Sequence, residues 1–309
     1  MKIEQWIVSG MIFMALVVAK PGMSASLPHT SGVPTQMVIT ARPDHGGNRP
    51  GSLVARDLIV LKDKGRVPVV SMQRLAGDFA DMQLFVLLDD STRSSSLSLQ
   101  LPELKTFLKS LPATTQVAVG YMRNGTFTLD QSFTADHQKV ANSLRLPMAI
   151  PGVNGSPYFA LSDLVKHWPS KQATSRRAVL MLTDGVDRYF GSATKDDPYV
   201  NAATKDALKK SVMVYSIYLQ GAGLSGRWLT NVAQSRLIEV SQETGGYAYF
   251  QGFTDPVTIS PFLNDLQDRL ENQYLVTVDA LNEKGFHSVK LQTELPGLKI
   301  EGPRYIYVR

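Results

Sequence analysis

Two apolar runs of strand length, each ending in an aspartate, most constrain the fold of this chain. The first is MQLFVLLD, which ends at Asp89, and the second is AVLMLTD, which ends at Asp184. Continuous apolar runs of this length are typical of strands buried on both faces, as strands are in parallel sheets. Segments with helical spacing alternate with these runs along the chain. The sequence therefore predicts an α/β fold with a doubly wound, mainly parallel sheet flanked by helices.

The segments on either side of this predicted sheet domain have a different character. Residues 26–50 are rich in Gly, Pro, Ser and Asn and are predicted to be loop, and two short strands around Lys64-Gly65 are predicted to form a hairpin. After a helix near SPFLNDLQDRLENQ, the last segments of the chain are predicted to be antiparallel strands. We expect the strands of both termini to form a small β-unit. The expected divisions are residues 26–80, 81–255 and 256–309.

The first 25 residues have the layout of a secretory signal peptide. Lys2 precedes an apolar run from Trp6 to Ala19, and small residues close the segment. A retained membrane anchor is the alternative, although the run is short and interrupted for a membrane span. We therefore expect an exported protein, periplasmic or extracellular, with no stable membrane span after the signal has been cleaved.

The composition argues against several classes of site. The chain of 309 residues has no cysteine, which excludes a thiol nucleophile and a cysteine-based zinc site. Its five histidines are far apart in the sequence and are expected in loops or on the surface. The net charge of +5 comes from scattered basic residues, a pattern that does not favour binding to nucleic acid.

Ligands in open parallel sheets bind beyond the carboxyl ends of the strands. Asp89 and Asp184 end two such strands, and Ser156 opens a helix between them. Oxygen ligands of this kind suit Mg²⁺ or Ca²⁺ rather than zinc. Structural roles are the alternative, because Ser156 is a suitable helix N-cap and Asp184 precedes Gly185 in a turn sequence. Asp89 needs a partner in either case, because a buried carboxylate loses its hydration.

Three segments together resemble the loops of the metal-ion-dependent adhesion site in von Willebrand factor type A domains: LFVLLDDSTRSSS, GSPYFALSDL and AVLMLTDGVD. The hairpin ARDLIVLKDKGRVPVVSM, the helix LIEVSQETGGYAYF and the closing strands resemble the bacterial exported version of the domain, over residues 53–309. The resemblance implies a binding or adhesion module. It also implies that a bound metal accepts a carboxylate from a protein partner.

The first of these loops departs from the family pattern Asp-x-Ser-x-Ser. Asp89 and Ser91 match, but Arg93 stands at the last position, where its permanent charge would neutralise the carboxylates and repel a divalent ion. A second register, Asp90, Thr92 and Ser94, preserves the ligand chemistry. A shift of one residue reverses the direction of the side chains, so the two registers exclude each other.

The resemblance, with both registers kept open, implies a metal site that Arg93 makes degenerate. Asp187 is expected to be exposed to solvent near this site. The implied metal ligands are Asp89, Ser91, Ser94, Ser156 and Asp184.

These observations predict an exported protein-binding or adhesion module without enzymatic activity. One alternative is a structural or assembly protein of the cell envelope that has lost metal-dependent binding. A metal-dependent hydrolase that uses Asp89, Asp90 and Asp184 is a further alternative. It is less favoured because the sequence supplies no general acid or base besides those aspartates. A serine hydrolase is not indicated either, because no GxSxG elbow is present, and the glycine-rich phosphate loops are also missing.

Overall fold

The computed structural model describes residues 34–44, 53–150, 155–190, 196–221, 226–279 and 283–309. The predicted signal peptide lies outside these ranges. None of the helices in the part of the chain that the structure describes is both long enough and apolar enough to span a membrane.

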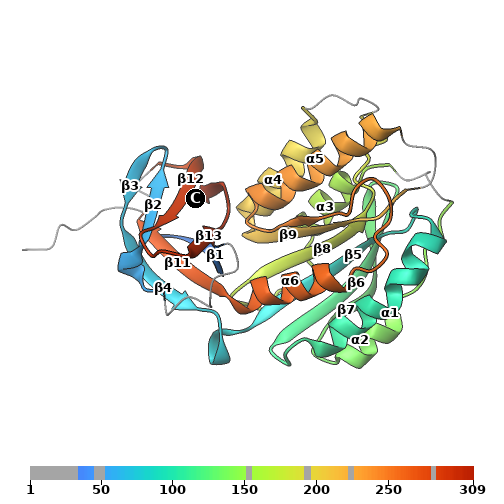
Figure 1. The fold of residues 1–309 in the computed structure, drawn as a ribbon, viewed down its shortest axis with the longest axis horizontal. Helices are drawn as coiled ribbons and strands as arrows, with labels where there is room; N and C mark the ends of the chain where they lie inside the picture. Colours follow the sequence, from blue (N-terminus) through green and yellow to red (C-terminus); the bar gives the residue numbers. More distant parts are fainter. Residues whose placement is uncertain (1–33, 45–52, 151–154, 191–195, 222–225, 280–282) are drawn as a thin grey trace, which may run out of the picture. The chain divides into compact units, whose positions relative to one another are not determined.

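A six-stranded sheet lies at the centre of the α/β domain, in the strand order β10-β9-β8-β5-β6-β7 (Figure 1). Neighbouring strands are parallel, except that β7 pairs antiparallel with β6. The strand β5 is buried along its whole length, as the apolar run Leu84–Leu88 predicts. The strands are β5 (Met82–Asp89), β6 (Thr115–Arg123), β7 (Thr126–Thr134), β8 (Arg177–Thr183), β9 (Val212–Tyr218) and β10 (Ala248–Tyr249).

Helices cover both faces of this sheet, because alternate residues of each strand point to opposite faces. Leu84 and Val86 of β5 share a core with α1, α2 and α6, whereas Phe85 and Leu87 share a second core with α3, α4 and α5. The predicted α/β fold with a doubly wound, mainly parallel sheet is thus confirmed. The helices are α1 (Ser94–Ser110), α2 (His137–Ser143), α3 (Pro157–Lys166), α4 (Pro198–Lys209), α5 (Arg227–Glu243) and α6 (Ser260–Glu271).

The terminal strands form two four-stranded antiparallel sheets that share a third core. One sheet has the order β13-β1-β11-β4 and the other β14-β12-β2-β3. Strands from the two ends of the chain therefore pair with each other, as the sequence predicts. The strands are β1 (Pro34–Pro43), β2 (Leu58–Lys62), β3 (Gly65–Val67), β4 (Val69–Arg74), β11 (Gln273–Asp279), β12 (Gly285–Thr293), β13 (Leu298–Glu301) and β14 (Tyr305–Val308).

The prediction of loop for residues 26–50 is wrong for β1. This strand lies inside its sheet, between β11 and β13. Met37, Ile39 and Ala41 are buried in the third core, while Gln36 is exposed. This alternation with a period of two is the signal for a strand, and the Pro- and Gly-rich residues that follow it obscured the pattern.

The terminal strands pack near the amino ends of the central strands (Figure 1). Gln273, at the start of β11, donates from its side-chain amide to the Tyr215 hydroxyl at 3.0 Å and accepts from Arg176, which directly precedes β8. The carboxyl ends of β5, β8 and β9, where the candidate site lies, therefore belong to the other edge of the sheet.

Candidate metal-binding site

Asp89 is the last residue of β5 and is buried. Its Oδ1 accepts hydrogen bonds from the Ser91 backbone N–H at 2.9 Å and from the Ser91 hydroxyl at 2.8 Å, and its Oδ2 accepts from the Thr183 hydroxyl at 3.0 Å. Burial and the neighbouring charge of Asp184 raise the pKa of Asp89, against the effect of these hydrogen bonds. A cation close to both aspartates would stabilise the ionised form.

Asp184 follows β8 and is held by its own loop. Its Oδ1 accepts from the Val186 backbone N–H at 2.9 Å, and its Oδ2 accepts from the Arg188 guanidinium at 2.6 Å. Gly221, in the loop after β9, leaves no room for a side chain, because a Cβ there would lie 1.8 Å from Asp184 Oδ2. Burial disfavours the charge of Arg188, but Asp184, Asp89 and Asp187 raise its pKa. Arg188 therefore supplies positive charge to this acidic cluster.

Ser156 caps the first turn of α3 and also contacts the third aspartate. Its Oγ accepts from the backbone N–H groups of Tyr158 and Phe159 at 3.2 and 3.4 Å, and it donates to Asp187 Oδ2 at 2.7 Å. Asp187 is only 3% exposed, so the expectation that it faces solvent is wrong. Its Oδ1 accepts from two backbone N–H groups of the following turn, and these bonds draw the side chain inward.

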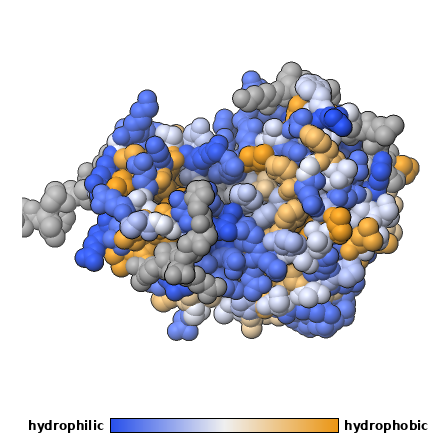
Figure 2. Space-filling model, viewed as in Figure 1, coloured by the Kyte–Doolittle hydropathy of each residue, from blue (hydrophilic) through white to orange (hydrophobic). Residues whose placement is uncertain are grey.

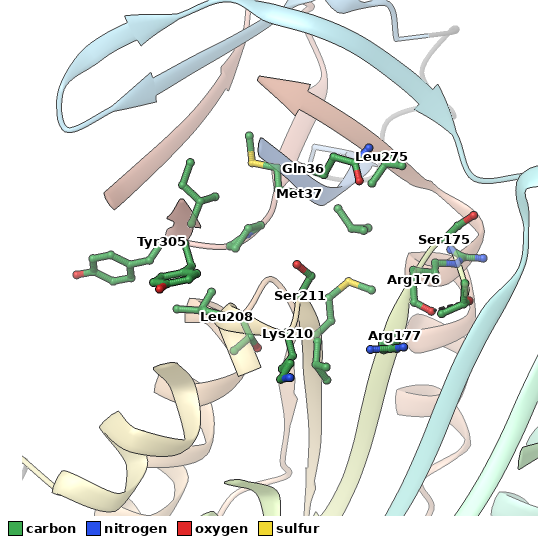
Figure 3. Close-up of a pocket in the computed structure, with 18 of the residues that line it drawn as sticks. Gln36, Met37, Ser175, Arg176, Arg177, Leu208, Lys210, Ser211, Leu275 and Tyr305 are labelled. Carbon is green, nitrogen blue, oxygen red and sulfur yellow. Dashed lines mark hydrogen bonds between the residues drawn. The ribbon is translucent and has the colours of Figure 1, made fainter. Parts of the chain in front are cut away.

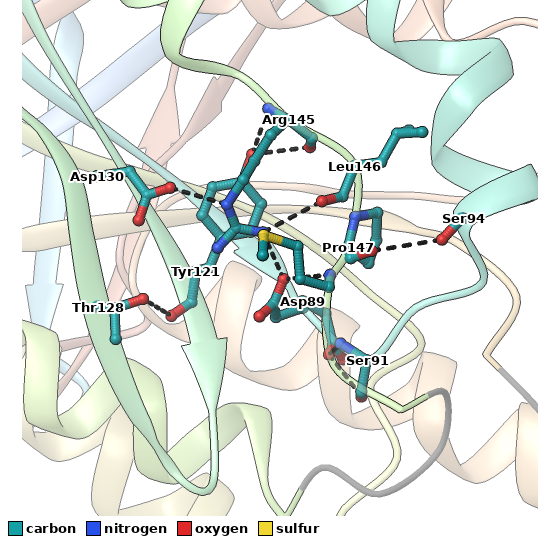
Figure 4. Close-up of polar contacts among 11 residues, drawn as sticks. Asp89, Ser91, Ser94, Tyr121, Thr128, Asp130, Arg145, Leu146 and Pro147 are labelled. Carbon is teal, nitrogen blue, oxygen red and sulfur yellow. Dashed lines mark hydrogen bonds and ion pairs between the residues drawn. The ribbon is translucent and has the colours of Figure 1, made fainter.

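Asp90, the first residue of the second register, takes part in a different contact. Its Oδ1 accepts from Arg145 at 2.6 Å and from the Met148 backbone N–H at 2.9 Å. Arg145 also lies over the Tyr121 ring and pairs with Asp130 at 3.0 Å (Figure 4). Asp90 thus anchors the loop that follows α2.

The other residues of the first loop are Thr92 and Ser94 of the second register and Arg93 of the first. Ser94 begins α1 and donates to the Pro147 carbonyl at 3.4 Å (Figure 4). Arg93 occupies the N-cap position of α1. Thr92 pairs with Gly221 in an isolated bridge, and its buried hydroxyl has no hydrogen-bond partner among the described residues. The structure brings Asp89, Ser91 and Asp184 together. Ser156 contacts Asp187, whose charge acts on the same arginine, Arg188.

This set of side chains fits a hard divalent ion in its chemistry. It offers carboxylates of Asp89 and Asp184 and hydroxyls of Ser91 and Ser156, and all four residues are buried. Arg188 already contacts Asp184, so an ion that coordinates Asp184 would have to displace its guanidinium. A divalent ion at this site would therefore compete with an arginine of the chain itself.

A second group with metal-ligand chemistry lies in the β-unit. Ligand atoms of Asp63, Glu283 and His287 are all within 4.8 Å of one another. Lys62 donates to Glu283 at 2.6 Å and to Asp63 at 3.4 Å, and its Nζ is 3.3 Å from His287 Nδ1. The ammonium group therefore supplies the positive charge, and we interpret the group as an ion-pair network.

No family model and no curated protein matches the chain. Solved structures do match it. An aerotolerance-related membrane protein from Bacteroides fragilis is 13% identical, with a TM-score of 0.44 over 61% of this chain and 98% of that chain. The mussel byssus proximal thread matrix protein 1, with a zinc-occupied MIDAS motif, is 15% identical, with a TM-score of 0.45 over 63% of this chain and 46% of that chain.

The pilus adhesin SpaC from Lactobacillus rhamnosus GG also matches, at 9% identity and a TM-score of 0.48, over 86% of this chain and 48% of that chain. These likenesses concern the fold alone.

Proposed function

We propose that this protein is an exported, non-enzymatic protein-binding module that captures its partner at the carboxyl edge of the central sheet. The observation that carries the proposal is a set of exposed hydrophobic side chains on the loops of that edge, around the acidic cluster. We call this set the edge hydrophobics: Leu146, Met148, Ile150, Tyr189, Trp228, Phe250, Phe253 and Val257.

Hydrogen bonds hold two of these loops at this edge. The backbone N–H of Tyr189 donates to Asp187 of the cluster at 2.9 Å, and that of Met148 donates to Asp90, which follows Asp89. Met148 is 73% exposed and Trp228, in the first turn of α5, is 63% exposed. Hydrophobic residues are visible at the right of Figure 2, at this end of the domain. Exposed apolar side chains gathered on one surface are typical of protein interaction sites.

The charge of the cluster suggests the kind of group that the partner presents. Arg188 is 23% exposed at its side chain, whereas Asp184 beneath it is 5% exposed. A partly exposed guanidinium among hydrophobic side chains is a suitable receptor for a carboxylate. If a divalent ion takes the place of Arg188, Asp89, Ser91, Ser156 and Asp184 would hold it. The ion would then supply the positive charge for the same carboxylate.

A structural or assembly protein of the cell envelope is the second candidate. The ion pair between Arg188 and Asp184 favours it, because the pair neutralises part of the cluster without a metal. Both candidates use the edge hydrophobics, and they differ in whether a divalent ion is needed.

The test compares proteins captured from envelope fractions of the native host by the parent chain and by two variants. The edge variant carries Met148→Ser and Ile150→Ser, and the control variant carries Val70→Ser and Phe79→Ser, which are exposed elsewhere. A partner retained by the control variant and lost by the edge variant is the expected result. Equal capture by both variants would reject the carboxyl edge as the binding surface.

A further inference from the structure

The sulfur of this protein is all in methionine, because the chain has eleven methionines and no cysteine. A two-electron oxidant such as hydrogen peroxide therefore meets no thiol, and the thioether of methionine becomes its target. Access to the sulfur decides which methionine reacts first. Seven of the methionines belong to the ranges that the structure describes.

One of these seven differs sharply from the others in its exposure. Met148, in the loop after α2, is 73% exposed. Met72 of β4 is half-buried against the third core. The remaining five are at most 4% exposed: Met37, Met82, Met122, Met181 and Met213.

Two of the buried methionines border a pocket that a small oxidant could enter. This pocket, of about 300 Å³, lies between the amino ends of β8 and β9 and the terminal strands, and Met37 and Met213 contribute to its lining (Figure 3). Both side chains are nevertheless packed into hydrophobic cores, Met37 into the third and Met213 into the first. They are therefore the natural internal comparison for Met148, and we expect them to react slowly.

The loop holds Met148 in solvent because its backbone is fixed to a buried carboxylate. The N–H of Met148 donates to Asp90 Oδ1 at 2.9 Å, and the N–H of Ala149 donates to the Asp90 carbonyl at 3.2 Å. Arg145 donates to the same carboxylate at 2.6 Å. The sulfur of Met148 is thus accessible in the folded protein, without local opening.

Met148 lies in the middle of a short row of exposed apolar side chains. Leu146, Met148 and Ile150 are exposed, and Pro147 between the first two is buried. This alternation is typical of an extended chain and places the three exposed side chains on one side of the loop. A sulfoxide is polar, so at the central position it would interrupt the row.

We propose that Met148 is a site of reversible oxidation by peroxides and that its sulfoxide makes the carboxyl edge of the sheet less apolar. The sulfur lone pair attacks one oxygen of hydrogen peroxide, and the S–O bond forms as the O–O bond breaks. The proton of the transferred oxygen passes to the leaving hydroxide, which departs as water. Sulfur loses two electrons and the peroxide gains them. Methionine sulfoxide reductases restore the thioether with two electrons from thiols, which become a disulfide, and the oxygen leaves as water.

The consequence for a bound partner rests on the function proposed above, because Met148 belongs to the edge hydrophobics. A sulfoxide there would weaken a contact that depends on burying apolar surface. The oxidation itself needs no partner, so it is measured on the isolated protein.

The first experiment measures where hydrogen peroxide reacts. The folded protein is treated with peroxide, the reaction is quenched with free methionine, and each sulfoxide is quantified by peptide mapping with mass spectrometry. We expect Met148 to be oxidised about tenfold or more faster than Met37, Met72 and Met213, with an unchanged melting temperature. In guanidinium chloride, where the chain is unfolded, the rates should become similar. Equal rates in the folded protein would overturn the proposal.

The second experiment measures the apolar character of the edge by retention on a phenyl column. Peroxide should shorten the retention of the parent, and reductases A and B with dithiothreitol should restore it. Met148→Gln should elute early without peroxide, and Met148→Leu should show no response to peroxide. Met72→Leu is the matched control and should respond as the parent does. A peroxide response that persists in Met148→Leu would overturn the proposal. Failure of the binding function would appear elsewhere, as equal capture of proteins by the unoxidised edge and control variants.

Discussion

Single residues decide the charge balance at the carboxyl edge of the sheet. Four buried aspartates lie there, and three of them, Asp89, Asp184 and Asp187, raise the pKa of Arg188. A buried carboxylate without a partner is costly. The contact between Arg188 and Asp184 therefore stabilises the fold, and it would compete with a divalent ion for Asp184.

Replacing Arg188 with glutamine is expected to expose this competition. The Arg188→Gln variant should melt at a lower temperature than the parent in EDTA, by the equivalent of about 1–3 kcal/mol, because Asp184 loses its charged partner. It should then gain a larger melting shift than the parent on addition of Mg²⁺ or Ca²⁺. An ion at one hundred times its Kd would raise the free energy of unfolding by about 2.7 kcal/mol.

The matched variant for this experiment is Arg93→Ser, which restores the family's serine in the first register. We expect it to respond to Mg²⁺ as the parent does, since the contact with Asp184 that the structure defines comes from Arg188. A gain of metal response in Arg93→Ser and none in Arg188→Gln would show that Arg93 is the competing cation.

Gly221 provides a second test at the scale of one residue. Gly221→Ala should destabilise the protein by about 1–3 kcal/mol, because its Cβ would overlap Asp184 Oδ2 and displace either the loop or the carboxylate. Gly65→Ala is the control, since the nearest atom to its Cβ would be at 3.4 Å. Equal midpoints for the two variants in urea denaturation would contradict this account.

The sequence predicts the strand-end aspartates because a continuous apolar run of strand length is a local signal that can be read without knowing the rest of the fold. Asp89 and Asp184 are found in this way, and Ser156 is found as a cap. The burial of Asp187 is misjudged, because backbone hydrogen bonds in the turn after β8 draw its side chain inward. Arg188 is missed, because its role depends on the charges of Asp89, Asp184 and Asp187, which come from two different strand ends. The spacing of four residues between Asp184 and Arg188 was the available signal.

At the scale of elements, the turn between β2 and β3 is fastened to β12 by an ion-pair network. Asp63 accepts from His287, from Lys62 and from the backbone and hydroxyl of Ser288. The hydrogen bond with His287 is the main cause that lowers the pKa of Asp63 to about 2.

This shift predicts a pH dependence of stability. An unfolded aspartate has a pKa of about 3.9, so the depressed folded value contributes stability above that pH and loses it as the pH falls toward 2. Asp63→Asn should therefore lower the melting temperature at pH 6, and the difference from the parent should vanish near pH 2. Asp268→Asn, at an exposed position of α6, is the control. A difference that persists unchanged at pH 2 would contradict the assignment.

Elements with a strong hydrophobic period are predictable, and elements whose period is short or interrupted are not. The hairpin of β6 and β7 follows from Asn124-Gly125, and both residues have the positive φ angles that this turn needs. The seven-residue helix α2 has too few turns for a clear pattern. β1 is hidden by its neighbours, and only its partners β11 and β13 show that it belongs inside a sheet.

At the scale of the whole molecule, Gln273 joins the terminal strands to the α/β domain. It is fully buried, it donates to Tyr215, and it accepts from Arg176. Gln273→Ala would leave a buried guanidinium with one acceptor fewer, at a cost of about 1–3 kcal/mol. The exposed Gln138→Ala is the control, and calorimetry is the measurement. A loss no larger than that of Gln138→Ala would show that Gln273 contributes little to the junction.

The last prediction concerns removal of residues 274–309. This deletion takes away β12, β13, β14 and nearly all of β11, and β11 is the strand that pairs with both β1 and β4. The apolar residues of β1 and β2 would then lose the strands that cover them, and their exposed edges would be open to pairing with other chains. We expect aggregation in size-exclusion chromatography with light scattering, and increased binding of a hydrophobic dye. A chain that starts at residue 26 and keeps its C-terminus is the control. A truncated chain that stays monomeric and melts at the parental temperature would show that the terminal strands do not support the rest of the molecule.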